Sequence, residues 1–178
     1  TKGLADYLGE HRDEIAPVVV GFDGRTSSRR FAGDTVGVFT AAGFPVRYFP
    51  TPAPTPLVAF AAAEYDATAA VVVTASHNPP ADNGYKVYDE NTAQIIPPVD
   101  SAIAAAIDRA PGAARVPRHE WMPGEKQLLA EPIGGDLAEF SRIEREHPGH
   151  SPGLVGRRQS RTVGAEGEVG HRRVIGQA

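Results

Sequence analysis

Residues 71–88, which read VVVTASHNPPADNGYKVY, determine how the rest of the chain is organised. Three consecutive valines that end in a proline-rich loop are typical of a strand buried on both faces of a sheet. The loop at 74–79 combines hydroxyl, imidazole and amide side chains, and two adjacent prolines stiffen it. Loops that follow buried strands in α/β sheets lie at the carboxyl ends of the strands, where such folds usually bind ligands. The sequence therefore predicts a functional loop here.

Ser76 in this loop is open to more than one interpretation from residue types alone. A hydrolytic nucleophile needs a general base, but the G-x-S-x-G elbow is absent, and neighbours such as Ser76 and His77 tend to point apart in an extended loop. A serine that carries a phosphoryl group needs donors and cations around it. His77, Asn78 and Lys86 can supply them. The structural alternative is a serine turn in which Asn78 caps its own backbone.

Two motifs resemble a known family. The string TASHNPPADNGYKVY at 74–88 closely resembles the phosphoserine loop of the α-D-phosphohexomutases, the phosphoglucomutase/phosphomannomutase family. In that family the serine of T-A-S-H-N-P, here Ser76, is phosphorylated, and the lysine of N-G-x-K, here Lys86, lies beside it. Residues 20–28, VGFDGRTSS, are similar to the family's first strand and its G-x-D-x-R-x-x-S turn. The resemblance covers roughly residues 4–108.

The resemblance implies a phosphomutase, an intramolecular phosphotransferase that interconverts hexose 1-phosphate and hexose 6-phosphate of glucose or mannose. Ser76 would donate its phosphoryl group to the sugar monophosphate, and the hexose bisphosphate so formed would return its other phosphate. Mg²⁺ bound to the phosphate on Ser76 would stabilise developing charge. Lys86 would be the acid/base or electrostatic group, with His77 and Arg25 as further catalytic residues. Arg25, Asn78 and Lys86 would contact the substrate.

Three family motifs are absent from this sequence: the D-x-D-x-D-R metal loop, the sugar-selecting G-E-x-S-G-H loop and the phosphate site of the last domain. Family enzymes have four domains, so the resemblance implies a fragment that is inactive by itself, and the start at Thr1 suggests an incomplete N-terminus. A non-catalytic phosphosugar-binding or regulatory module is the first alternative, and an unrelated serine hydrolase is the second. The loop is more similar to the glucose/mannose or pentose branches than to the glucosamine branch.

Composition excludes several classes of protein. The 178 residues have room for one ordinary domain, and no apolar run approaches membrane-spanning length. The absence of cysteine excludes disulfides and thiolate metal sites and fits a cytoplasmic enzyme. A count of 18 basic against 22 acidic residues, net −4, gives no support for nucleic-acid binding. We expect a cytoplasmic protein that binds hexose phosphate and hexose bisphosphate but neither nucleic acid nor membrane. The sequence leaves the oligomeric state open.

Residues 148–178 differ from the rest of the chain. They contain seven glycines, no aromatic residue, and five arginines against two glutamates, a net charge of +3 that leaves −7 for residues 1–147. We expect a phosphohexomutase domain at 1–147 and a Gly/Arg-rich tail at 148–178 that is either disordered or the product of a truncation or an altered reading frame. RNA binding by the tail is the alternative, but no aromatic side chains interleave its basic residues.

Hydrophobic periodicity predicts alternating strands and helices. Strands are expected at 18–22, 46–49, 69–74 and 85–88, and helices at 1–14, 28–42, 57–65 and 99–109. The link through Asn83-Gly84 predicts that the last strand runs antiparallel to its neighbour. The fold class is therefore α/β: a three-layer domain with a mixed, mostly parallel sheet of about four strands flanked by helices.

Side-chain positions follow from the same periodicity. The helix at 28–42 should turn one stripe inward: Phe31, Thr35, Val38, Phe39 and Ala42. Gly43 should end that helix in a left-handed conformation. The helix at 99–109 should bury Ile103 and Ile107. A further helix is expected at 135–146, and Trp121 should pack on the domain at a place that the pattern does not define.

Overall fold

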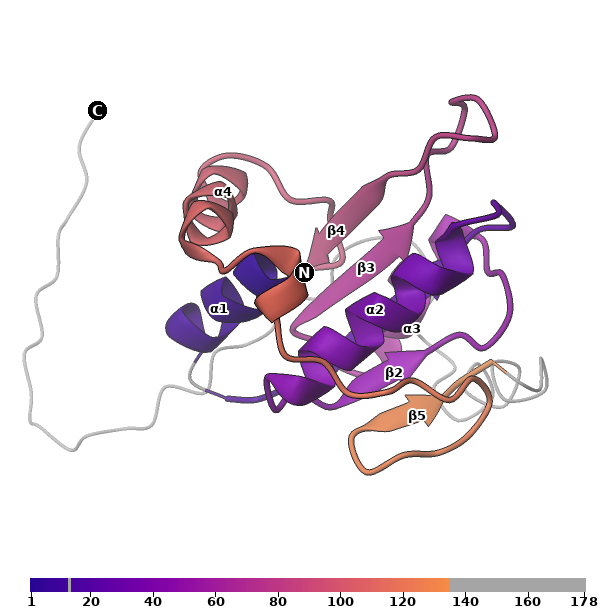
Figure 1. Cartoon of the computed structure of the whole chain (residues 1–178), viewed down its shortest axis with the longest axis horizontal. Coiled ribbons are helices and arrows are strands. Elements are labelled where there is room, and N and C mark those ends of the chain that lie inside the picture. Colours follow the sequence, from indigo (N-terminus) through magenta and orange to yellow (C-terminus); the bar gives the residue numbers. More distant parts are fainter. Residues whose placement is uncertain (13, 135–178) are drawn as a thin grey trace, which may run out of the picture.

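A mixed sheet of five strands forms the centre of the computed structural model, which describes residues 1–12 and 14–134 (Figure 1). Its strands are β1 (Val18–Phe22), β2 (Val46–Tyr48), β3 (Ala69–Val73), β4 (Tyr85–Asp89) and β5 (Ala130–Pro132). They lie in the order β4-β3-β1-β2-β5. The β3–β4 pair is antiparallel and the other three pairs are parallel. The α/β class and the mixed, mostly parallel sheet are confirmed, and the structure adds a fifth strand to the four expected.

Helices cover both faces of this sheet, as a three-layer domain requires. They are α1 (Lys2–His11), α2 (Ser28–Ala41), α3 (Thr55–Glu64) and α4 (Val99–Arg109), followed by a short 3₁₀ helix, Ala113–Arg115. Successive strand residues point to opposite faces. Val18 and Val20 of β1 therefore join the core formed with α1, α2 and α4, whereas Val19 joins the core under α3.

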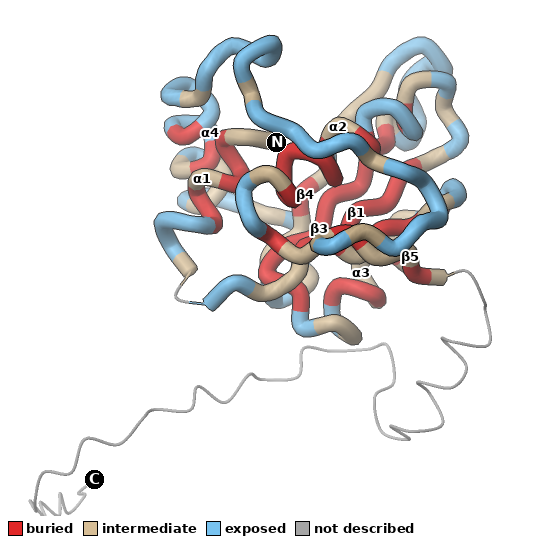
Figure 2. The backbone as a smooth tube through the Cα atoms, turned by 60° about the horizontal axis from the view of Figure 1, so that its bottom comes forward, coloured by how far each residue is buried: buried red, intermediate tan, exposed pale blue. Residues whose placement is uncertain are grey.

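The two central strands, β1 and β3, are buried along their whole length. Figure 2 shows them as buried tube at the centre of the domain, with exposed loops around them. Val71, Val72 and Val73 are each at most 1% exposed, which confirms the strand expected from this run. Burial on both faces explains why their sequence is a continuous apolar run and not an alternating one.

The apolar stripe expected on α2 is partly wrong. Phe31 is 36% exposed and Ala42 lies at the exposed C-cap, whereas Ala32 and Val36 are buried. The physical reason is a segment at 118–121 that crosses α2 and buries its small residues, which carry little apolar signal. A Cβ added at Gly33 would lie 2.4 Å from the Trp121 ring.

Four further positions complete the comparison with the expected side-chain and backbone positions. Ile107 of α4 is 54% exposed and not inward as expected, while Ile103 is buried as predicted. Trp121 packs edge-on against Tyr48, with ring centroids 5.5 Å apart. Gly43 has φ +90°, the left-handed conformation expected after α2.

Strand β5 was not expected because three residues, the last of them a proline, are too short to show a period-2 pattern. Its pairing with β2 sets Val46 beside Ala130. The helix expected at 135–146 and the tail expected at 148–178 lie outside the described residues. Among the helices of residues 1–12 and 14–134, none has the length and apolar character needed to cross a bilayer.

The contact between α1 and α4 gives a test of this packing. A Cβ added at Gly3 would lie 2.6 Å from the Cα of Ile107, so Gly3→Ala should push the two helices apart. We expect it to lower the free energy of unfolding by about 1–3 kcal/mol in a denaturant titration. Gly9, on the same helix, has nothing within 4 Å of an added Cβ. Gly9→Ala is the matched control and should stabilise by about 0.5–1 kcal/mol.

Candidate active site

The turn after β1 and the loop after β3 lie side by side at one edge of the sheet. Their strands are parallel neighbours, so both segments leave the sheet at its carboxyl edge. The Asp23 N–H donates to the Val73 carbonyl at 3.1 Å and joins the two segments at their base. The Thr74 N–H donates to the Gly84 carbonyl at 3.0 Å and closes the loop. Figure 1 shows the β3–β4 loop projecting beyond the sheet.

Ser76 lies exposed in this loop, within reach of Lys86. The Lys86 ammonium on β4 donates a hydrogen bond to the Ser76 Oγ at 2.7 Å. The antiparallel β3–β4 register, which sets Val72 opposite Lys86, brings the lysine to the carboxyl end of β3. Ser76 has φ +51°, a left-handed backbone that is uncommon for serine. An exposed hydroxyl with an ammonium on its oxygen can accept or release a phosphoryl group with its charge partly balanced.

The structural alternative is present in part, because the Ser76 N–H donates to the Thr74 Oγ1 at 3.0 Å, as in a threonine turn. Asn78, in contrast, does not cap its own backbone in the described residues. The Asn78 amide side chain faces Asp82, with Nδ2 3.5 Å from Oδ2. The loop does contain a turn, because the Asn78 N–H donates to the Ala75 carbonyl at 3.0 Å. The Ser76 Oγ is nevertheless turned toward Lys86 and solvent, not toward this main chain.

The structure brings Ser76 and Lys86 together, whereas His77 and Asn78 lie exposed beside them. The group on the Ser76 oxygen is the Lys86 ammonium and not the His77 imidazole. This arrangement lacks the serine–histidine contact on which a hydrolase mechanism depends. Both side chains are exposed to solvent, and the Asn78 amide has Asp82 as its one weak partner among the described residues.

Arg25 is directed into the loop by Asp23. The side chain of Arg25 is only 12% exposed, and its Nε donates to the Asp23 Oδ2 at 3.0 Å. Asp23 also accepts the Arg25 backbone N–H at 3.1 Å, so it orients both the guanidinium and the turn. Partial burial acts to raise the pKa of Asp23, but hydrogen bonds from Ser28, Thr74 and Arg25 outweigh it and lower the pKa below its ordinary value.

Sequence reasoning missed Asn83 and Ser28 as parts of this site. The Asn83 side chain donates from Nδ2 to Ser28 Oγ at 2.9 Å, and Ser28 Oγ donates to Asp23 Oδ1 at 2.5 Å. Ser28 is fully buried at the start of α2. Asn83 was interpreted only as a turn residue, and the one available signal was its place as the first residue of the N-G-x-K motif.

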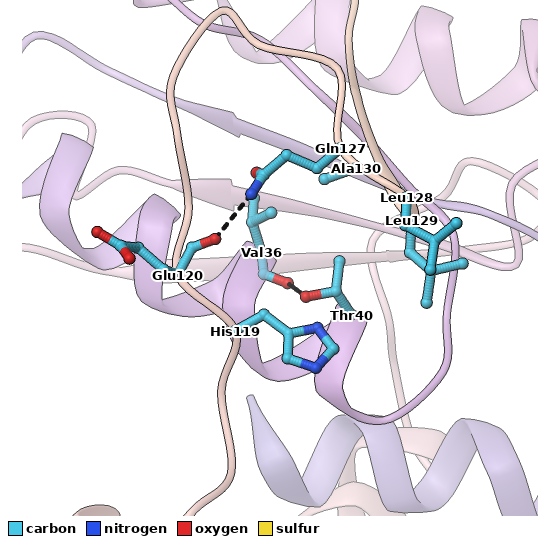
Figure 3. A pocket seen from close by; sticks show the side chains of 8 residues that line it. All are labelled: Val36, Thr40, His119, Glu120, Gln127, Leu128, Leu129 and Ala130. Atoms are coloured by element: carbon cyan, nitrogen blue, oxygen red, sulfur yellow. Dashed lines mark hydrogen bonds between the residues drawn. The ribbon is translucent and has the colours of Figure 1, made fainter.

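The described surface includes two hollows that bear on the choice of site. One borders the Arg25 turn and is lined by Phe22, Asp23, Gly24, Arg25, Arg29, Pro50, Thr51 and Pro52. Figure 3 shows the other, between α2 and the chain at 119–130, where Gln127 Nε2 donates to the Glu120 carbonyl at 2.9 Å. None of the expected site residues lines this second pocket, and most of its surface is apolar. We therefore assign the candidate site by the chemistry of the Ser76 loop.

The Mg²⁺ expected on a phosphorylated Ser76 finds no ready-made protein site here. The described part of the chain contains no group of three or more His, Cys, Asp or Glu residues that could hold a metal ion. Mg²⁺ favours octahedral oxygen ligation with carboxylates, phosphates and water. These residues alone therefore do not fit a Mg²⁺ centre, and no step proposed below depends on one.

Comparison with known proteins finds relatives of this chain. Residues 1–112 match the family described as "Phosphoglucomutase/phosphomannomutase, alpha/beta/alpha domain I". A Haemophilus influenzae protein named "Probable phosphomannomutase" is 47% identical over 110 residues, 60% of this chain and 22% of that protein. The phosphoribomutase of Saccharomyces cerevisiae is 45% identical over 111 residues, 61% of this chain and 18% of that protein.

A solved structure has the same fold. A Thermus thermophilus protein assigned as a phosphomannomutase superposes with a TM-score of 0.58 at 30% identity, over 74% of this chain and 28% of that one. The chain spans about a fifth of the length of these two curated relatives.

Proposed function

Because this chain belongs to the phosphoglucomutase/phosphomannomutase family, we propose that its Ser76 is the phosphoryl carrier of a sugar-phosphate mutase. The observation that supports this role is the Lys86 ammonium, 2.7 Å from the exposed Ser76 oxygen. Phosphoryl transfer requires alignment and charge neutralisation more than covalent assistance from the protein. An exposed hydroxyl with a cation on its oxygen meets the second requirement.

The proposed reaction moves one phosphoryl group at a time. A hydroxyl of the sugar monophosphate attacks the phosphorus on Ser76, a new P–O bond to the sugar forms, and the P–O bond to Ser76 breaks. The sugar hydroxyl loses a proton and the serine oxygen gains one, with Lys86 stabilising the charge that develops there. The bisphosphate then turns around and returns its other phosphoryl group to Ser76 by the same steps in reverse. His77 and Asn78 are proposed to contact the transferring group and the substrate.

The proposed substrates are hexose 1-phosphate and hexose 6-phosphate of glucose or mannose. The names of the relatives include a phosphomannomutase and a phosphoribomutase, so likeness in this domain is compatible with both hexose and pentose substrates. The proposal rests on the phosphoserine chemistry common to both. A cytoplasmic location, expected from the cysteine-free sequence, belongs to the same proposal.

The test is transfer to the 178-residue chain itself. Incubation with hexose 1,6-bisphosphate should add the mass of one phosphoryl group, which peptide fragmentation should locate on Ser76. Steady-state conversion of glucose 1-phosphate, with Mg²⁺ and bisphosphate present, should stay negligible because the metal and sugar motifs are absent from the sequence.

Other outcomes would contradict specific parts of the proposal. A chain that never gains a phosphoryl group would indicate a non-catalytic module. Labelling of Ser76 by an organophosphate probe would instead support a serine hydrolase. Ordinary mutase turnover would show that the 178-residue chain is sufficient for the whole reaction.

A further inference from the structure

The guanidinium of Arg25 uses all of its N–H donors within the protein. A guanidinium has five such donors. Nε binds Asp23 at 3.0 Å, and Nη2 binds the Ser76 and Asn78 carbonyls at 2.9 and 2.8 Å. Nη1 binds the Pro79 and Asp82 carbonyls, the latter at 3.2 Å. With five contacts for five donors, none remains for a substrate phosphate.

These contacts fix the direction of peptide groups in the loop. In a trans peptide the C=O and the following N–H point in opposite directions. Because the Ser76 carbonyl faces Arg25, the His77 N–H faces away from it, next to the residue that would carry phosphate. In the described chain this N–H donates to no protein acceptor. The residues that follow Asn78 and Pro79 are prolines, which have no backbone N–H. The Asn78 and Pro79 carbonyls can therefore face Arg25 without turning a backbone N–H away from an acceptor.

A buried anchor holds Arg25 in place. Asp23 binds the guanidinium, and it also accepts a hydrogen bond from Ser28, which is fully buried. Ser28 in turn accepts from Asn83 at 2.9 Å, at the far end of the same loop. These contacts form a closed ring, because Arg25 also binds the carbonyl of Asp82, the residue before Asn83. Through this ring, the Ser76 end and the Asn83 end of the loop are both held at the start of α2.

We infer that Arg25 is a positioning residue: it holds the loop carbonyls so that Ser76 keeps its left-handed backbone and directs its Oγ at Lys86. This role replaces the substrate contact suggested by the sequence, and it rests on the proposed function of Ser76. Arg25 acts through the loop and does not touch the transferring group. A lysine could serve a phosphate contact, but it presents its donors from one point and cannot span four carbonyls.

The first test measures loop conformation by NMR on the 178-residue chain. In Arg25→Ala and Arg25→Lys, the Ser76 ¹³Cα and ¹³Cβ shifts and the HN–Hα coupling should lose their left-handed values, while core methyl signals stay. Arg30→Ala is the matched control, since Arg30 is an exposed arginine that lies over the Phe31 ring, and it should leave Ser76 unchanged. Unchanged Ser76 signals in both Arg25 variants would overturn the inference.

The second test measures phosphoryl transfer from hexose 1,6-bisphosphate to Ser76. A displaced nucleophile should lower the maximal rate, by about 100-fold, and leave the half-saturating donor concentration unchanged. Arg25→Lys should behave like Arg25→Ala. A raised half-saturating concentration with a normal maximal rate, or full rescue by lysine, would identify a substrate contact and overturn the inference.

The two tests distinguish failure of the proposed function from failure of the positioning role. If wild type accepts no phosphoryl group, the proposed function fails while the NMR result still decides the role of Arg25 in the loop. If wild type is phosphorylated and the loop signals ignore Arg25, only the positioning role fails.

Discussion

Ser76→Ala is expected to abolish the gain of a phosphoryl group from hexose 1,6-bisphosphate, because the acceptor oxygen is removed. Phosphoryl gain should be lost completely, because among the described residues the Lys86 ammonium donates a hydrogen bond to no hydroxyl other than that of Ser76. Intact-mass measurement over a time course shows the difference directly. Ser101→Ala, at an exposed serine on α4, is the control and should accept phosphate like wild type.

Alanine alone does not separate lost chemistry from altered loop conformation, because Ser76 has φ +51°. Glycine adopts positive φ without steric cost, so Ser76→Gly should keep the loop conformation while still lacking the hydroxyl. We expect Ser76→Gly to be unphosphorylated yet as stable as wild type in thermal unfolding. Phosphate on either variant would place the acceptor elsewhere and contradict the proposed role of Ser76.

The parts of the fold that could be predicted are the helices and strands that a local run or period of apolar residues indicates. The strand at Val18–Phe22 and the helix at Val99–Arg109 have the predicted bounds, because valine runs and an apolar helical period depend little on distant partners. The exposed Phe31 could not be predicted in this way. The position of the α2 core face depends on residues 118–121, which lie far away in the sequence.

In the candidate site, too, one part could be predicted from local sequence and another could not. The approach of Lys86 to Ser76 follows from an antiparallel partner strand, which the Asn83-Gly84 link indicated, and the family motif named the same pair. The environment of Arg25 could not be predicted, because four of its five acceptors are backbone carbonyls, and a carbonyl has no side-chain signature. The sequence shows that an arginine is present, but only the folded loop shows that its donors are already used.

Replacing Lys86 should cause the second large loss. Lys86→Met keeps most of the aliphatic stem on β4 but removes the ammonium 2.7 Å from the Ser76 oxygen. A positioned acid/base group contributes about 10²–10⁴-fold, so we expect the rate of phosphoryl acceptance to fall by that factor while thermal unfolding changes little. Lys86→Arg keeps the charge in a wider planar group and should recover part of the rate.

The matched control for Lys86 is Lys126, which forms an ion pair at the opposite edge strand of the sheet, β5. Lys126 donates to Glu131 of β5 at 3.0 Å, and its side chain is 72% exposed. Lys126→Met should therefore leave phosphoryl acceptance unchanged and cost at most about 1 kcal/mol of stability. If Lys86→Met accepts phosphate as fast as Lys126→Met, the hydrogen bond to Ser76 is a surface contact without a role in transfer. A fall confined to Lys86→Met, with equal unfolding temperatures for the two variants, would show that the ammonium acts on the chemistry and not on the fold.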